Sequence, residues 1–176
     1  MSTPASIAKH PIHPMLIAFP IGLWIFSFIC LLVFWRGGAE AWETAAIYSM
    51  GGGIFGALAA AIPGLIDLLD IPPSRARTKG IWHGVINVVA LVIFTAAFFL
   101  RGGMTTTQFV LLSAVGVLLL FVSGWLGGSM VYVHGVGVEF KGKDERRQRM
   151  DQQKDQPGEP ASEQQKQTRQ REPVEV

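Results

Sequence analysis

The sequence predicts an all-α integral membrane protein: an antiparallel four-helix bundle with a disordered C-terminal tail. Hydrophobic residues make up 49% of the 176-residue chain and charged residues only 16%. Four apolar stretches reach the roughly 20 residues that a helix needs to cross a bilayer core. Charge is concentrated in residues 141–176, which hold nine Lys or Arg and eight Asp or Glu. We therefore predict a transmembrane domain at 1–140 and a tail at 141–176 that cannot bury a core.

The apolar stretches predict helices at about residues 15–35, 44–69, 81–100 and 109–133. Short loops join the first helix to the second and the third to the fourth, so consecutive helices should be antiparallel neighbours. Small residues recur at every fourth position of the second helix, which allows close helix packing. These residues are Gly52, Gly56, Ala60 and Gly64. No internal sequence repeat is evident.

The cationic residues predict the orientation, because Lys and Arg favour cytoplasmic loops. Most of them fall on one side of the predicted bundle, namely Lys9, Arg75, Arg77, Lys79, Lys141, Lys143, Arg146, Arg147 and Arg149. We expect a multi-pass protein of the bacterial inner membrane with both termini in the cytoplasm and the lipid bilayer as its main partner. A net charge of +2 is too small to indicate nucleic-acid binding. The lone Cys30 excludes a disulfide framework, and no Cys-x-x-Cys-His segment for covalent haem attachment is present.

Two histidines stand at the entrance to the first helix. His10 and His13 alternate with prolines, and Pro14 at the first helical position would make His13 the cap of this helix. The positive end of a helix dipole disfavours imidazolium and keeps a ring nitrogen available for a metal. The alternative is a pair of interfacial histidines solvated by lipid headgroups.

The other histidines fall on the same predicted membrane face. His83 begins the third helix, His134 ends the fourth, and Asp67 lies near the end of the second. Because ionisable groups at membrane depth are costly unless paired or coordinating, these residues indicate a metal or cofactor site. The predicted metal ligands are His13, His83, His134 and Asp67, with His10, Asp70 and Asn87 around them. A structural polar layer remains the alternative, because helix ends are where His and Asp are least costly.

Several motifs carry a family resemblance. They are His10-Pro-Ile-His-Pro-Met-Leu-Ile-Ala-Phe-Pro-Ile21, Gly64-Leu-Ile-Asp67, Trp82-His83 and Gly127-Gly-Ser-Met-Val-Tyr-Val-His-Gly-Val-Gly-Val138. Over residues 8–138 the chain resembles the bacterial membrane family called domain of unknown function 2231, which is grouped with the two-haem cytochrome b superfamily. The resemblance implies haem b, with His13, His83 and His134 as candidate ligands. Arg75, Arg77 and Lys79 lie where the propionates would emerge.

We slightly prefer His83 and His134 as the axial pair, because both lie on helical faces with small or polar neighbours. No histidine falls in the outer half of a helix, which argues against a second haem. The first hypothesis is thus a haem b-binding, redox-active bundle with a site near the cytoplasmic face, working with a redox partner or as a homo-oligomer. The second is a non-haem zinc or iron site. The third is a cofactor-free partner subunit or small permease. No signature such as His-Glu-x-x-His predicts a stand-alone enzyme.

Overall fold

The computed structural model describes residues 4–8, 10–138 and 150–151. Within them, four helices are long and apolar enough to cross a membrane, which confirms the predicted fold class. They are α1 (Ile12–Trp35), α2 (Glu40–Asp70), α3 (Arg75–Leu100) and α4 (Thr106–Tyr132), with a short 3₁₀ helix η1 (Arg101–Gly103) and two short strands β1 (Ser6–Ile7) and β2 (His10–Pro11). The predicted tail lies almost wholly outside the described residues.

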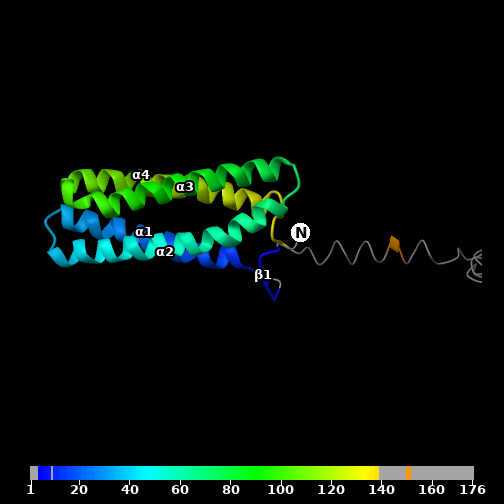
Figure 1. Ribbon diagram of the computed structural model, residues 1–176, viewed down its shortest axis with the longest axis horizontal. Coiled ribbons are helices and arrows are strands. Elements are labelled where there is room, and N and C mark those ends of the chain that lie inside the picture. The colour runs from blue at the N-terminus through cyan, green and yellow to red at the C-terminus, as the bar shows by residue number, and fades with distance from the viewer. Residues whose placement is uncertain (1–3, 9, 139–149, 152–176) are drawn as a thin grey trace, which may run out of the picture. The chain divides into compact units, whose positions relative to one another are not determined.

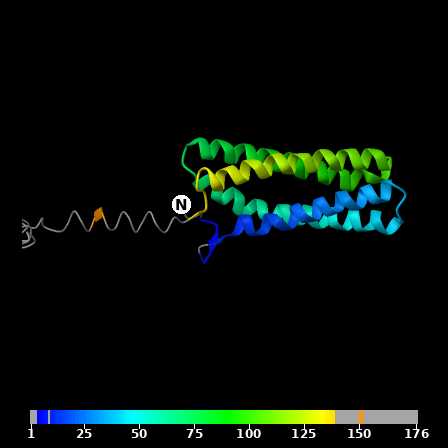
Figure 2. The same ribbon diagram turned by 180° about the vertical axis from the view of Figure 1, so that it is seen from behind.

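The helices form two antiparallel hairpins that lie side by side (Figure 1). The closest packing joins α1 to α2 and α3 to α4, and α2–α3 and α1–α4 contacts hold the hairpins together. Seen from behind, the same two layers run parallel along the length of the bundle (Figure 2). One end carries the N-terminal strands, the α2–α3 connection and the end of α4. This end is called the strap end below, after the short N-terminal segment that carries the paired strands β1 and β2. It is the end predicted to face the cytoplasm.

All four helices begin before their predicted starts, and α2 also ends one residue later than predicted, because residues outside the apolar stretches continue the helical turns. Ser74 caps α3 by accepting a hydrogen bond from the backbone N–H of Arg77 at 3.3 Å. Thr105 and Gln108 form a capping box that starts α4 three residues before the predicted position. The fourth helix ends at Tyr132, one residue early.

The prediction that His13 caps the first helix is wrong. The cap is Pro11, so His13 is the second and Pro14 the third residue of α1. Proline is tolerated there because the first four N–H groups of a helix have no partner within it. His13 is therefore fixed by the helical backbone itself.

The small residues of α2 allow close helix packing, as predicted, and the helix that they approach is α1. A Cβ atom added at Gly52 would lie 3.0 Å from Leu23, and one added at Gly56 would lie 3.2 Å from Pro20. Trp24 of α1 also donates from Nε1 to the carbonyl oxygen of Met50 at 3.2 Å. The glycines thus let the first hairpin close tightly.

The outward surface of the bundle is apolar along its length, as lipid contact requires. Large side chains with more than 60% of their surface exposed occur on all the spans, and include Phe19, Tyr48, Phe55, Val92, Phe99, Leu118 and Trp125. Trp35 and Trp42 lie exposed near one end of the bundle and Trp82 near the other, where aromatic belts meet the membrane interfaces.

Candidate functional site

His13 is held by the other helix of its own hairpin. Its Nδ1 lies 2.8 Å from the carbonyl oxygen of Ala60 on α2. Since a carbonyl oxygen only accepts, Nδ1 carries the proton and Nε2 carries the lone pair. The ring lies directly over Gly64, where an added Cβ would come within 2.7 Å of Nδ1. Gly64 is therefore required for the ring to reach its carbonyl partner.

His83 is held in the same manner in the second hairpin. Its Nδ1 lies 2.9 Å from both the carbonyl oxygen and the hydroxyl of Ser123 on α4. The amide nitrogen of Asn87, one turn further along α3, lies 3.0 Å from Nε2 and donates to it. The partners assign the proton to Nδ1 and the lone pair to Nε2, as in His13. The ring lies over Gly127, where an added Cβ would be 3.1 Å from Cε1.

The two imidazoles meet across the boundary between the hairpins. Their centroids lie 6.2 Å apart and their planes are perpendicular, at 90°. Each ring is tied at Nδ1 to a backbone carbonyl of a neighbouring helix. The structure thus builds a histidine pair, His13 and His83, from two separately anchored rings.

The histidine pair belongs to a repeated arrangement. Eleven residues after His13 comes Trp24, and eleven residues after His83 comes Phe94; the two aromatic rings stack at 4.3 Å. On the partner helices, Gly53 lies beside Trp24 and Gly116 beside Phe94. Each of these glycines precedes its histidine-anchoring residue, Ala60 or Ser123, by seven positions. The bundle therefore contains two equivalent half-sites, although the sequence showed no evident repeat.

These anchoring residues were missed from the sequence. The signal that identifies them is a paired pattern: a histidine with an aromatic residue eleven positions later, and a glycine, a small residue and a second glycine at spacings of seven and four. The second pattern occurs as Gly53, Ala60 and Gly64 and again as Gly116, Ser123 and Gly127. Neither pattern is conspicuous alone in a chain with 20 glycines.

The other predicted ligands lie elsewhere. Asp67 accepts a hydrogen bond from the backbone N–H of Ala5 at 2.9 Å. His134 is exposed in the turn that follows α4, and Asp70 and His10 are exposed as well. Within the described part of the chain, no three His, Cys, Asp or Glu side chains form a group that could hold a metal ion. The structure therefore does not gather His13, His83, His134 and Asp67 into one shell, and it brings His13 rather than His134 beside His83.

The predicted cationic residues lie on the first two turns of α3, before His83. Arg75 is exposed. Arg77 is partly buried and donates from Nη1 to the carbonyl oxygen of Ile71 at 3.2 Å. Lys79, also partly buried, donates from Nζ to the hydroxyl of Ser129 on α4 at 2.5 Å. Positive charge is thus fixed at the strap end of the second hairpin.

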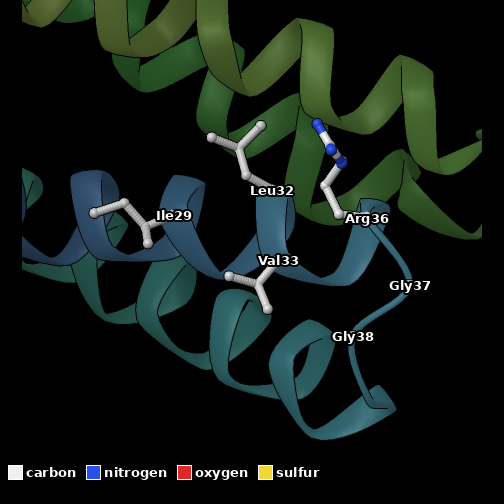
Figure 3. Close-up of a pocket in the computed structure, with 6 residues that line it drawn as sticks. All are labelled: Ile29, Leu32, Val33, Arg36, Gly37 and Gly38. Carbon is white, nitrogen blue, oxygen red and sulfur yellow. The ribbon is translucent and has the colours of Figure 1, made fainter.

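A hollow lies at the opposite end of α1 (Figure 3). It is lined by Ile29, Leu32, Val33, Arg36, Gly37 and Gly38, and the Arg36 side chain extends toward the second hairpin. Apart from Arg36 its lining has no polar side chain, and it is remote along α1 from His13. We therefore place the candidate site at the histidine pair.

Comparison with known proteins gives one result. Residues 9–140 match a family described as "Predicted membrane protein (DUF2231)". No curated protein and no solved structure matches the chain. The matched range contains all four spans and both half-sites.

Proposed function

We propose that this chain, which belongs to the DUF2231 family of predicted membrane proteins, binds one haem b between His13 and His83 and serves in electron transfer. The observation that carries the proposal is the histidine pair, with ring centroids 6.2 Å apart and both Nδ1 atoms anchored. Cofactor sites in four-helix bundles are built from side chains of facing helices in this way.

The separation of the rings would allow His13 and His83 to hold one iron between them. A transition metal binds an imidazole nitrogen at about 2 Å, so two rings on opposite sides of one metal have centroids roughly 6 Å apart. The Nδ1 bonds to Ala60 and Ser123 leave Nε2 as the lone-pair nitrogen of each ring. Such outer hydrogen bonds fix the tautomer and orientation of a ligating histidine.

The number of ligands also favours haem over a non-haem ion. A protein zinc site needs three or four side-chain ligands, whereas haem brings four equatorial nitrogens and requires only the axial pair. The described residues offer two histidines here and no third ligand in the group. When bound, haem supplies a one-electron redox centre in a low-dielectric site.

The negatively charged propionates of haem would find positive side chains at the strap end. Arg77 and Lys79 lie on α3 one to two turns before His83, where both are partly buried. We propose that these two cations, with the exposed Arg75, pair with the propionates. The positive-inside rule then places the site near the cytoplasmic face of a bacterial inner membrane, with both termini in the cytoplasm.

The test is the absorption spectrum of detergent-purified protein before and after dithionite, with the haem content per chain. We expect one haem and sharp reduced bands, lost in both His13→Ala and His83→Ala. His10→Ala is the matched control, because His10 is exposed and lies outside α1; its spectrum should match the wild type. Equal haem content in all the variants contradicts the proposal. A colourless wild type from haem-replete cells favours a cofactor-free polar layer instead.

A further inference from the structure

The two half-sites differ at the strap end. In the second hairpin α3 begins at Arg75, eight residues before its histidine, whereas α1 begins at Ile12, one residue before His13. His13 therefore lies in the first turn of its helix, where helices fray. The first hairpin lacks the two additional helical turns that α3 has before its histidine. It has instead an N-terminal strap, defined as residues 4–8, 10 and 11, in which β1 pairs with β2.

The strap is joined to both helices of the first hairpin through Ala5. The backbone N–H of Ala5 donates to Oδ1 of Asp67 on α2 at 2.9 Å. The carbonyl oxygen of Ala5 accepts from the N–H of Ile12, the first residue of α1, at 3.0 Å. Ala5 itself is buried, with 9% of its surface exposed. A single residue thus links the Asp67 carboxylate to the helical turn that carries His13.

Asp67 stands where a carboxylate is otherwise disfavoured. It lies in the last turn of α2, whose dipole presents negative charge, and that turn has no basic residue. Asp67 is only partly exposed, and a carboxylate at membrane depth is costly unless it is paired. Asp67 follows Gly64 by three positions and Ala60 by seven, so all three residues share one helix face. On that face the Ala60 carbonyl accepts the hydrogen bond from His13, Gly64 accommodates the ring, and Asp67 holds the strap.

We propose that Asp67 clamps the N-terminal strap onto α2 and so keeps His13 against the Ala60 carbonyl, which makes Asp67 a positioning residue for the histidine pair. The clamp is independent of the ligand, and only its consequence for haem rests on the proposed function. Asp67 thereby has a role other than the metal ligation that its sequence context predicted.

The clamp is tested by the exposure of Ala5. In membranes or detergent, we would measure the maleimide labelling rate of Ala5→Cys in the full chain with Asp67, Asp67→Leu or Asp67→Asn. Loss of the acceptor oxygen leaves the buried Ala5 N–H without a partner, which should raise the labelling rate about tenfold or more. Asp67→Asn keeps the acceptor oxygen and should label near the parent rate. Ile7→Cys, whose site is 69% exposed, should label rapidly in every background.

The positioning role is tested on His13 itself, again without reliance on haem. Carbethoxylation of His13 with diethyl pyrocarbonate, followed by peptide mass mapping, should rise several-fold in Asp67→Leu and be restored in Asp67→Asn. The exposed His134, in the turn after α4, provides the internal reactivity standard, and Asp70→Leu on the same helix end should leave His13 unchanged. Unchanged His13 reactivity in Asp67→Leu overturns the positioning role, and an equal rise in Asp70→Leu does so too.

Haem content then separates this inference from the proposed function. If the wild type binds haem, Asp67→Leu should retain less of it on dilution, with Asp67→Asn close to normal. Full retention in Asp67→Leu overturns the positioning role. A wild type without haem contradicts the proposed function alone, because labelling of Ala5→Cys and carbethoxylation of His13 still decide the clamp.

Discussion

Trp24 and Phe94 stack face to face across the boundary of the two hairpins, with ring centroids 4.3 Å apart and planes 12° apart. Both rings are almost completely buried. Because Trp24 follows His13 and Phe94 follows His83 by the same eleven residues, the stack and the histidine pair are two layers of one repeated arrangement. The aromatic layer joins the two hairpins eleven residues beyond the histidine pair along α1 and α3.

Removing this stack should loosen the bundle. Phe94→Ala leaves a cavity beside Trp24 and Gly116, and truncating a buried aromatic residue costs about 3–5 kcal/mol. We expect a clear fall in the thermal unfolding midpoint in detergent. Phe99→Ala, five residues further along α3 at a side chain that is 73% exposed, is the control. Equal midpoints for the two variants would show that the stack does not hold the hairpins together.

The glycines beneath the imidazoles should not tolerate a methyl group equally. Gly64→Ala places a Cβ 2.7 Å from His13 Nδ1, closer than Cβ contacts occur, whereas Gly127→Ala places one 3.1 Å from His83 Cε1. Gly64→Ala should therefore displace His13 from the Ala60 carbonyl at a cost of about 1–3 kcal/mol, and Gly127→Ala should have a smaller effect. Haem retention on dilution and the unfolding midpoint measure both.

Gly124→Ala is the control for these variants, because an added Cβ there meets nothing within 4 Å. Alanine favours a helix over glycine by roughly 1 kcal/mol, so this variant should be as stable as the wild type or more so. A Gly64→Ala protein that behaves like Gly124→Ala would contradict the close contact between Gly64 and His13.

If haem binds as proposed, Asn87 would compete with the iron for Nε2 of His83. Its amide donates to His83 Nε2 at 3.0 Å, so ligation must release this hydrogen bond, which is worth about 1 kcal/mol net. Asn87→Ala leaves the Nδ1 bond to Ser123 in place and should raise haem affinity roughly fivefold. The measurement is haem titration of the apoprotein. Weaker haem binding by Asn87→Ala than by the wild type would contradict this prediction and show that Asn87 supports the binding orientation of His83.

The fold was predictable because long apolar stretches in the sequence are enough to indicate membrane-spanning helices. Four apolar stretches of sufficient length leave a membrane bundle as the one architecture that satisfies their backbones. The helix starts were less predictable: residues such as Arg75 and Lys79 are helical in α3 although they lie outside the apolar stretch. Polar residues at an interface carry little information on where a helix begins.

The site was predictable only in part. Sequence placed His13, His83, His134 and Asp67 at one end of the bundle, since helix direction fixes depth. The sequence did not determine which face of its helix each side chain lies on. Asp67 binds the Ala5 N–H and His134 lies in the exposed turn after α4, whereas His13 and His83 converge. Their hydrogen-bond partners are the backbone carbonyls of Ala60 and Ser123. Every residue has such a carbonyl, so the side chains in the sequence say little about which one accepts.

The most direct test of the central claim, shared ligation by His13 and His83, is the low-temperature EPR spectrum of the ferric protein. Perpendicular imidazole planes leave two iron d orbitals nearly degenerate, which gives low-spin ferric haem one very large g value. With the rings at 90°, we predict this highly anisotropic low-spin signal, absent in His13→Ala and in His83→Ala. A high-spin ferric signal in the wild type, or a low-spin signal that survives either substitution, would contradict ligation by the pair.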